Sequence, residues 1–391
     1  MPSKNLSMKK NLNDDLIKAY QKRFHWLPNA IISAPGRINL IGEHTDYSGG
    51  FVLPFAIDLR IFIAFGKRND KQVELVSLDF DDEISFNLDC MDIHRENWKT
   101  YLTAIAMVMR EDGYNLNGWQ GVISGTIPIG AGLSSSAALE VACILAFCQA
   151  SDLNLSPKII ALLGQKAETN WVGIKVGIMD QLISAAGKAD HAMFLDCESL
   201  NWEHTRIPSN VSVFVLDTMT RRNLSNSKYN ARHEELQKAH QIIGFPQFRS
   251  ITLDTIKHLR EVGSLSLVLY NRAKHVITEN KRVIEFSQAM QQEDLVSMGR
   301  LIIQSHQSLR DDFEVSSTEL DLIVELAQNQ PNCLGARMTG AGFGGCALAL
   351  LENKNFEEFI TKVSQRYQQK TNYLPQIYKV YPSDGGKITM I

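Results

Sequence analysis

The sequence predicts an α+β fold of two lobes, and three observations lead to this prediction. The chain has 391 residues, and because domains of ~150 residues are common, more than one hydrophobic core is expected. The first half mixes strand-like and helix-like segments, whereas the second half is richer in helical patterns. This order is neither all-β nor a strict alternation of strand and helix, which is typical of α+β proteins.

The first half contains runs of β-branched and aromatic residues that are bounded by Gly, Pro or Asp, and such runs predict strands. Longer segments carry apolar residues at helical spacing and predict helices. The predicted strands are 30–33, 51–57, 61–65, 73–77 and 121–127, and the predicted helices are 14–24, 98–110, 135–149 and 157–170.

The second half shows helical spacing with charged faces over most of its length. We place the boundary between the lobes in the polar stretch 197–210, which gives an N-terminal lobe of residues 1–200 and a C-terminal lobe of residues 201–391. The predicted helices are 229–243, 252–259, 270–291, 295–309 and 319–328, and short strands are predicted at 212–217, 346–351 and 376–381.

The charge balance excludes some classes of partner. Lys and Arg number 40 against 43 Asp and Glu, for a net charge of −3. This balance argues against binding to duplex nucleic acid or to an anionic membrane surface, both of which select a basic face. A phosphorylated small molecule needs only local positive potential and stays possible.

The sequence also predicts a compartment. The first fifteen residues lack the apolar stretch of ~7–15 residues that a secretory signal needs, and the longest strongly apolar run, near residue 141, is far shorter than the ~20 residues of a membrane span. The six cysteines include no pair at CxxC spacing, and scattered free thiols fit a reducing compartment. We therefore expect a soluble, cytoplasmic protein.

A glycine- and serine-rich segment, residues 130–140, follows a predicted strand and opens a predicted helix. Glycine lets backbone N–H groups approach an anion closely, and a helix N-terminus attracts negative charge. No lysine follows as in a P-loop, so Mg²⁺ and a distant basic residue would have to supply the positive charge. The alternative is a serine-capped helix after a glycine turn.

A second glycine-rich segment, residues 340–345, fits the GxGxxG pattern. A dinucleotide site would require a strand before the glycines and a helix after them. The segment that follows is short and strand-like, and the preceding residues 337–339 do not predict a buried strand. We therefore reject a dinucleotide site and expect a turn or a close backbone approach to a ligand.

Two polar segments lie beside apolar runs. Residues 34–47 include Arg37, Glu43, His44 and Asp46, and polar groups this dense next to buried strands must be paired or solvated. They suit a site for a sugar or polyol, and the alternative is a surface turn with ion pairs. In residues 177–182, Asp180 is either a base in an apolar context or the N-cap of a helix at 181–186.

Together these segments resemble the GHMP small-molecule kinase superfamily and, within it, the galactokinase family. Residues 36–47 match the galactokinase signature, 130–140 match the second superfamily motif, and 340–346 match the third. The family's Gly-Ile-Met-Asp-Gln stands at 177–181, and the resemblance spans roughly residues 14–385 in unbroken order. It implies a two-lobed fold with the active site in the cleft between the lobes.

The resemblance also implies an activity: ATP-dependent phosphorylation of the C1 hydroxyl of α-D-galactose to galactose 1-phosphate and ADP, a step of galactose catabolism by the Leloir pathway. Asp180 matches the catalytic aspartate and Arg37 the arginine that stabilises the transition state. The other matched residues are sugar contacts at Glu43, His44, Thr45, Asp46, Gly177 and Tyr229, a nucleotide phosphate loop at Gly130, Ala131, Gly132, Leu133, Ser134, Ser135 and Ser136, further nucleotide contacts at Ser77 and Trp98, and magnesium ligands at Ser136 and Glu168.

The implied partners are galactose, ATP and Mg²⁺, with no nucleic acid and no membrane, and we expect a monomer because no long apolar stripe suggests an interface. Two alternatives stay open. The chain could be a sugar sensor that binds ATP and galactose without turnover, although residues 134–138 of the second motif, Asp180 and Arg37 are all present. It could also prefer N-acetylgalactosamine, since specificity depends on room around the C2 substituent.

Overall fold

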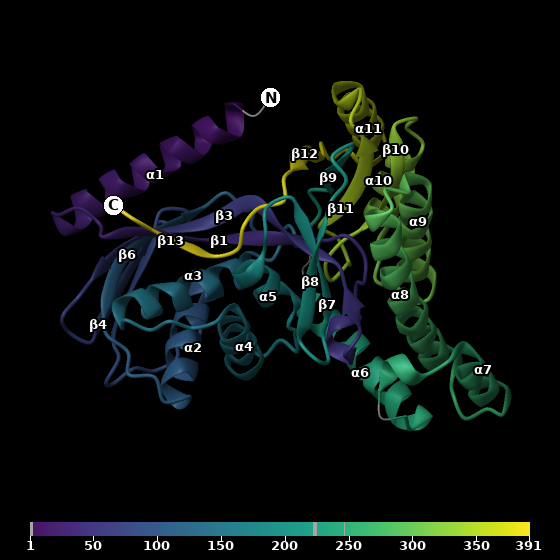
Figure 1. Ribbon diagram of the computed structural model, residues 1–391, viewed down its shortest axis with the longest axis horizontal. Coiled ribbons are helices and arrows are strands. Elements are labelled where there is room, and N and C mark those ends of the chain that lie inside the picture. The colour runs from purple at the N-terminus through teal and green to yellow at the C-terminus, as the bar shows by residue number, and fades with distance from the viewer. Residues whose placement is uncertain (1–2, 222–224, 246) are drawn as a thin grey trace.

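The computed structural model describes residues 3–221, 225–245 and 247–391. A six-stranded sheet dominates the first half, with the strand order β13-β1-β3-β6-β4-β5 (Figure 1). All neighbours pair antiparallel except β4 and β6, which are parallel. The strands are β1 (Ala30–Asn39), β3 (Pro54–Lys67), β4 (Gln72–Ser77), β5 (Asp82–Asn87), β6 (Trp119–Gly125) and β13 (Lys387–Met390).

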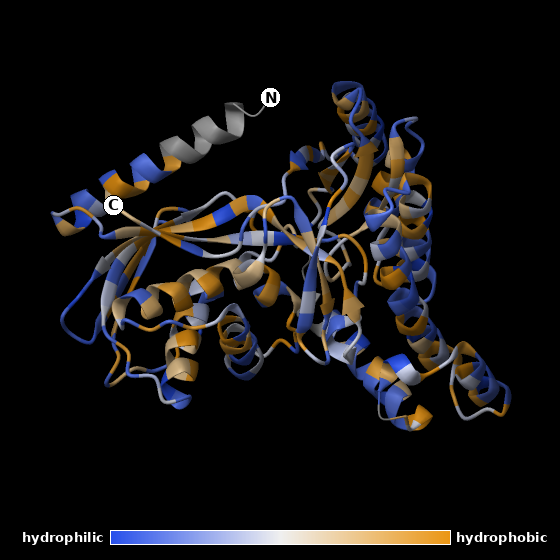
Figure 2. Cartoon of the chain, in the orientation of Figure 1, coloured by the Kyte–Doolittle hydropathy of each residue, from blue (hydrophilic) through white to orange (hydrophobic). Residues whose placement is uncertain are grey.

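Helices cover both faces of this sheet (Figure 1). The alternation of β3 explains why: Phe62 and Ala64 pack toward α1, whereas Ile63 and Phe65 pack toward α2 and α3. Figure 2 shows α3 in largely hydrophobic colours, which agrees with its burial between the sheet and other helices. The helices are α1 (Ser3–Phe24), α2 (Asn97–Glu111), α3 (Ser135–Ala150), α4 (Pro157–Ala167) and α5 (Met179–Ala186).

The second half is built on a four-stranded antiparallel sheet in the order β10-β11-β9-β12. Its helices pack on this sheet and on one another. The strands are β9 (Val211–Asp217), β10 (Cys333–Met338), β11 (Cys346–Glu352) and β12 (Gln376–Val380), and the helices are α6 (Ser225–Ile243), α7 (Leu253–Glu261), α8 (Leu267–Gln291), α9 (Leu295–Asp311), α10 (Thr318–Gln328) and α11 (Phe356–Thr371).

A third, three-stranded sheet joins β2 (Phe51–Val52), β7 (His191–Asp196) and β8 (Asn201–Arg206). One hydrophobic cluster contains Leu40 and Phe55 of the first half together with Phe286 and Leu348 of the second. The two halves therefore share buried apolar surface, which fixes the residues of one half against those of the other. Two 3₁₀ turns, Asp46–Ser48 and Phe248–Ser250, and a π-helical turn, Glu168–Val172, complete the described elements.

The structure confirms the α+β class and corrects several predicted elements. Residues 337–339 were not predicted to form a buried strand, yet β10 runs through Arg337 to Met338 and is buried at this end. The polar stretch 197–210, predicted as a lobe boundary, contains β8. The division at residue 200 stays a prediction, and it does not account for β13, which returns the last residues of the chain to the first sheet beside β1.

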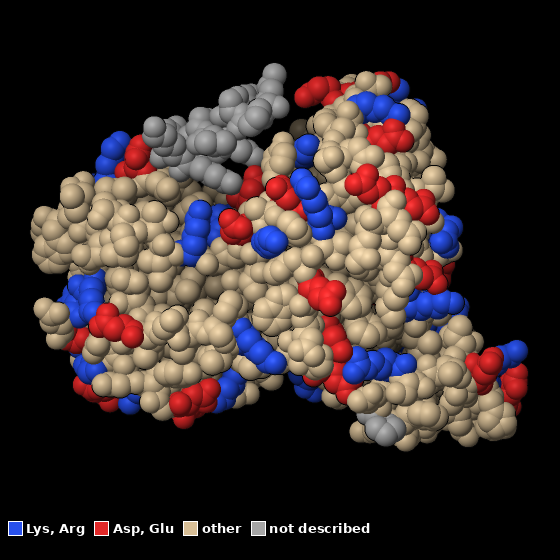
Figure 3. Space-filling view, viewed as in Figure 1, with Lys and Arg blue, Asp and Glu red and all other residues tan. Residues whose placement is uncertain are grey.

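The surface agrees with the near-neutral charge. On the face in Figure 3, Lys and Arg side chains are interspersed with Asp and Glu. In the described part of the chain, no helix combines the length and the apolar character that a bilayer crossing requires.

Candidate active site

A cavity of about 510 Å³ is lined by residues from both halves of the chain. Its walls come from the segments that the sequence singled out, together with residues that follow β9 and β10. Most predicted site residues line it: Arg37, Glu43, His44, Asp46, Gly130, Gly132, Ser134, Ser135, Ser136, Glu168, Gly177, Asp180 and Tyr229.

An ion pair between Arg37 and Asp180 lies at the wall of this cavity. Nε of Arg37 is 2.7 Å from Oδ1 of Asp180, and Nη2 is 2.7 Å from Oδ2. Such a two-point pair fixes the orientation of the carboxylate as well as its charge. Burial opposes the charge of Arg37, but the carboxylates of Asp180, Glu43 and Asp46 outweigh it and raise the pKa of the guanidinium.

The backbone explains how the pair forms. Arg37 follows a register shift in β1 after Pro35, and its N–H donates to the carbonyl of Leu133 at 3.1 Å. A Cβ at Gly36 would lie 2.6 Å from that carbonyl oxygen, so this close approach requires glycine. Asp180 is the second residue of α5 and not its N-cap, which corrects the capping alternative.

Loop 130–136 leads from β6 into α3 and touches the same ion pair. Nη1 of Arg37 donates to the carbonyl of Gly132 at 2.9 Å, and the hydroxyl of Ser134 donates to Asp180. Ser134 occupies the N-cap position of α3 with a φ of 57°, but its side chain makes no capping hydrogen bond. The capping alternative is therefore wrong for Ser134, and the N-terminus of α3 keeps N–H groups for a ligand.

Glu168 and Ser136 are hydrogen-bonded neighbours close to Asp180. Glu168 is 4% exposed, accepts a hydrogen bond from Ser136, and accepts another from Nε2 of Gln181 at 2.8 Å. Burial, with the charge of Asp180, raises the pKa of Glu168 to about 7. The same Gln181 nitrogen donates to Glu140 at 3.0 Å, and Oε1 of Glu140 is buried without a hydrogen-bond partner among the described residues.

This donor set fits a magnesium ion. Mg²⁺ takes oxygen ligands and keeps several waters, so one or two protein ligands plus substrate phosphates are sufficient. A buried carboxylate whose pKa is raised gains from a nearby cation, because the cation favours the ionised form.

Loop 42–46 supplies a second, more enclosed wall. Residues 42–45 are buried, and His44 adopts a φ of 63° while its Nδ1 lies 3.0 Å from the hydroxyl of Tyr47. The Tyr229 ring lies 5.6 Å from the His44 ring. The alternative of a surface turn at 34–47 is therefore wrong, since β1 and the residues up to 45 are buried.

Asp46 packs directly on the backbone of Gly177. A Cβ at this glycine would lie 2.0 Å from Oδ2 of Asp46, so only glycine fits here. Burial and the nearby charges of Asp180 and Glu43 raise the pKa of Asp46 to about 7.

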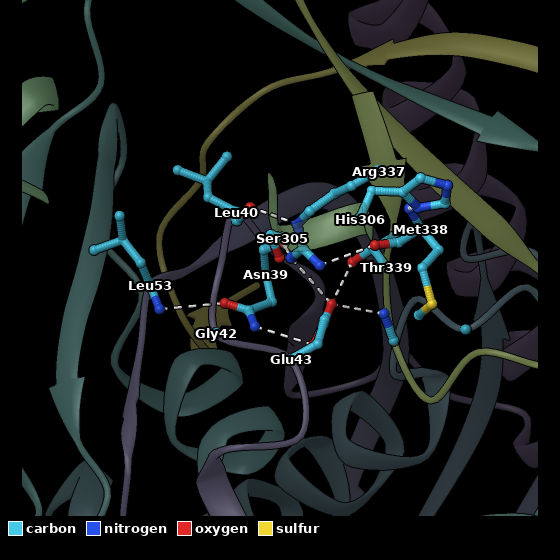
Figure 4. A network of polar contacts seen from close by, with 12 residues as sticks. Asn39, Leu40, Gly42, Glu43, Leu53, Ser305, His306, Arg337, Met338 and Thr339 are labelled. Atoms are coloured by element: carbon cyan, nitrogen blue, oxygen red, sulfur yellow. Dashed lines mark hydrogen bonds and ion pairs between the residues drawn. The ribbon is translucent and has the colours of Figure 1, made fainter. Parts of the chain in front are cut away.

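Glu43 lies at the centre of a buried polar network (Figure 4). Its Oε1 accepts hydrogen bonds from Oγ1 of Thr339 at 2.9 Å and from the backbone N–H of Gly340 at 2.7 Å, and lies 3.2 Å from Arg337. Its Oε2 accepts from Asn39 at 3.0 Å. The carboxylate therefore ties loop 42–46 to the start of the glycine-rich segment 340–345.

Five predicted site residues do not line the cavity. Thr45 is buried, and its hydroxyl donates to the carbonyls of Gly42 and Phe51 at 2.9 and 2.8 Å, which closes the loop. Ala131 and Leu133 pack in the shared core. Ser77 accepts a hydrogen bond from the N–H of Phe80 at 3.3 Å, and Trp98 packs in the core of the first half. Contacts of Ser77 and Trp98 with a nucleotide stay a prediction.

The structure adds residues that the sequence analysis did not assign to the site. Arg221 lines the cavity from the second half, next to Gly130, and is paired with the fully buried Asp217 at 2.6 Å. The sequence feature that could have indicated Arg221 is an arginine shortly after a predicted strand that ends in an aspartate. The other additions are Tyr101, Ile129, Ile174, Val176, Met179, Gly340 and Ala341.

Comparisons with known proteins agree with this geometry. The model described as "Galactokinase galactose-binding signature" matches residues 18–67, which contain loop 42–46. The GHMP kinases N terminal domain matches residues 99–188 and the GHMP kinases C terminal model matches residues 286–369. A galactokinase of Roseiflexus sp. (strain RS-1) is 39% identical over 377 residues, which cover 95% of this chain and 96% of that protein. The chain belongs to the galactokinase family.

Solved structures extend the likeness to the whole fold. The crystal structure of Lactococcus lactis galactokinase complexed with galactose superposes with a TM-score of 0.91 at 32% identity, over 96% of this chain and 99% of that chain. The Methanococcus jannaschii mevalonate kinase superposes with a TM-score of 0.64 at 20% identity, over 91% and 99%, and shares the fold. The chain thus has the two-domain GHMP kinase fold of a galactokinase.

Proposed function

We propose that this chain transfers the γ-phosphoryl group of ATP to the C1 hydroxyl of α-D-galactose, giving α-D-galactose 1-phosphate and ADP. The observation that carries the proposal is the ion pair of Arg37 and Asp180 at a cavity that loop 42–46 and loop 130–136 both line. One loop suits a sugar and the other suits phosphates, so the acidic group lies where the two substrates would meet. Membership of the galactokinase family supports the choice of sugar.

Phosphoryl transfer requires positioning and charge stabilisation more than covalent chemistry. The Asp180 carboxylate would accept the proton of the C1 hydroxyl as the new O–P bond forms and the bond to the ADP oxygen breaks. Arg37 holds that carboxylate in place through two hydrogen bonds, and its charge stabilises the transferring group.

Loop 130–136 would bind the phosphates through backbone N–H groups at the N-terminus of α3. Ser136 and Glu168 would hold Mg²⁺, which would neutralise phosphate charge when bound. The side chains of His44, Asp46 and Tyr229 would contact the sugar, with Gly177 making room beside Asp46.

The expected setting is galactose catabolism by the Leloir pathway in the cytoplasm, carried out by a monomer. The near-balanced surface charge supports small-molecule partners over nucleic acid or membrane.

A panel of sugars with an assay for ADP release tests the proposal. We expect galactose to give the highest kcat/KM, with release that depends on both sugar and Mg²⁺. A higher kcat/KM for N-acetylgalactosamine would change the substrate. Binding of galactose and ATP without any ADP release would contradict the enzyme and favour the sugar sensor.

A further inference from the structure

We propose that Arg337, a residue of the second half that does not line the cavity, is a positioning residue for the sugar site. It fixes loop 42–46 from behind by binding the backbone just before the loop and the carboxylate of Glu43. The proposal rests on the proposed function in one respect, namely that loop 42–46 binds the sugar.

The guanidinium of Arg337 is fully buried, and three of its four partners lie in residues 39–43, at the entrance to the loop and in the loop itself. Nε donates to the carbonyl of Leu40 at 2.8 Å, and Nη2 donates to the carbonyl of Asn39 and lies 3.2 Å from Glu43. Nη1 turns back to the carbonyl of Met338 at 2.9 Å. Figure 4 shows the side chain reaching across to this segment.

This arrangement requires the planar guanidinium of an arginine, with its several N–H donors. The planar guanidinium binds three carbonyls, two of them just before the loop, and a carboxylate at once, which a single ammonium cannot reproduce. The segment that is fixed continues through Gly42 and Glu43 into His44 and Asp46, the residues proposed to contact the sugar.

The second half of the chain supplies further contacts to loop 42–46. The N–H of Gly42 donates to Glu279 of α8 at 3.0 Å, and the Glu43 carbonyl oxygen lies 3.1 Å from Nε2 of His275. Burial lowers the pKa of His275 to about 4, which favours the neutral ring, and because a carbonyl oxygen only accepts, Nε2 is the nitrogen that donates to Glu43. Loop 42–46 thus belongs to the first half in sequence but is held in shape by α8 and β10.

The two oxygens of the Glu43 carboxylate have different partners. Three of its four partners, Arg337, Thr339 and Gly340, come from the second half and converge on Oε1. Oε2 accepts from Asn39, so it retains acceptor capacity for one substrate hydroxyl. Oε1 therefore fixes the loop, and Oε2 is the atom left for the sugar.

Arg337→Lys is the first test, because a lysine keeps a positive charge near Glu43 but loses the fork to the two carbonyls. We expect the KM for galactose to rise about tenfold while the KM for ATP changes less than about twofold. The lost charged hydrogen bonds fix loop 42–46 and do not contact loop 130–136. Amide hydrogen exchange should quicken in residues 39–46 and stay unchanged in residues 130–136.

Thr339→Val is the milder test, in case Arg337→Lys folds poorly. It removes one donor from Oε1 of Glu43 and leaves Arg337 in place. We expect a smaller rise in the KM for galactose, of about two- to fivefold, with the same pattern of exchange.

Arg60→Lys is the matched control. Arg60 is also a buried arginine that binds backbone carbonyls, those of Asp384 and Gly385 at 2.7 and 2.6 Å, and it has no contact with loop 42–46 among its described hydrogen bonds. It should lower Tm without raising the KM for galactose selectively.

Equal rises in both KM values in Arg337→Lys, or an unchanged KM for galactose with unchanged exchange in 39–46, would overturn the proposal. If the unmodified protein does not phosphorylate galactose, the proposed function fails. The exchange comparison of the three variants then decides the role of Arg337 independently.

Discussion

Loop 42–46 and loop 130–136 line one cavity but are built in opposite ways. The first is buried, and its central carboxylate accepts hydrogen bonds from four protein donors drawn from both halves. The second is partly exposed, with glycines at φ of 70° and 83° and half-buried serines, and it is held by Arg37 and Asp180. The first loop is therefore fixed before any ligand arrives, whereas the second keeps polar groups free for one.

The difference suits the two proposed substrates. A neutral sugar is selected by hydroxyl groups at fixed positions, so preorganised acceptors give specificity at little entropic cost. A nucleotide carries its own charge and brings phosphate oxygens that complete a metal site, so an open loop with unsatisfied N–H groups is sufficient.

The largest expected effect falls on Asp180, where the two loops meet. Its carboxylate accepts a hydrogen bond from Ser134 of the open loop, and its charge adds to burial in raising the pKa of Asp46 in the buried loop. Asp180→Asn should lower kcat by about 10²- to 10⁴-fold, the range for loss of a general base. Galactose binding, measured by calorimetry without nucleotide, should stay detectable.

Asparagine is the informative replacement because its carbonyl can still accept from Arg37. Asp180→Ala would leave that buried cation unpaired, which costs about 3–5 kcal/mol of stability for a buried pair. A Tm close to that of the unmodified protein shows that Asp180→Asn is folded, and near-normal turnover in such a protein would remove Asp180 from the mechanism.

The next effect should be confined to the open loop. Glu168→Gln and Ser136→Ala should each raise the Mg²⁺ concentration for half-maximal activity by about 10- to 100-fold, the usual loss when a metal site is altered. Mg²⁺-dependent binding of ADP, measured by calorimetry, should weaken in parallel while the affinity for galactose stays unchanged. Metal dependence equal to that of the unmodified protein in both variants would show that the ion is held elsewhere.

The same contrast explains how much the sequence could predict. Loop 130–136 and the segments that contain Arg37 and Asp180 were singled out because glycine, serine and charges next to apolar runs are visible locally. Their roles were predicted from the family resemblance, and the structure brings these residues together at one cavity. The helices α2, α3, α8 and α9 were also predicted within a few residues, since their periodicity is a local property.

The missed features depend on contacts far apart in the chain. A strand through Arg337 contradicts local patterning. It pairs with β11, and its buried guanidinium is bound by the carbonyls of Asn39 and Leu40 and neutralised by Glu43, nearly 300 positions away. The pairing of β13 with β1 and the approach of Arg221 to Gly130 are likewise set by tertiary packing. The residues that support the buried loop therefore cannot be predicted from the local sequence, whereas the glycines and serines of the open loop are visible in it.

The smallest expected effect is a pH dependence that belongs to the buried loop. The pKa of Asp46 is raised to about 7 by burial and by the charges of Asp180 and Glu43. If Asp46 contacts the sugar as proposed, a galactose hydroxyl would donate to the ionised carboxylate, so binding should favour that form and weaken as Asp46 takes up a proton. Between pH 8 and pH 6 the ionised fraction falls about tenfold for such a group, and the Kd for galactose should rise by the same factor.

Calorimetric titration of galactose in the absence of nucleotide checks this, because it leaves the open loop and its metal out of the measurement. Asp46→Asn should bind galactose more weakly at pH 8 and show a Kd that is level from pH 6 to pH 8, since the amide does not titrate. A level Kd in the unmodified protein would mean that the sugar does not bind Asp46 through its charge. An unchanged slope in Asp46→Asn would assign the titration to another group and would separate Asp46 from the preorganised acceptors of loop 42–46.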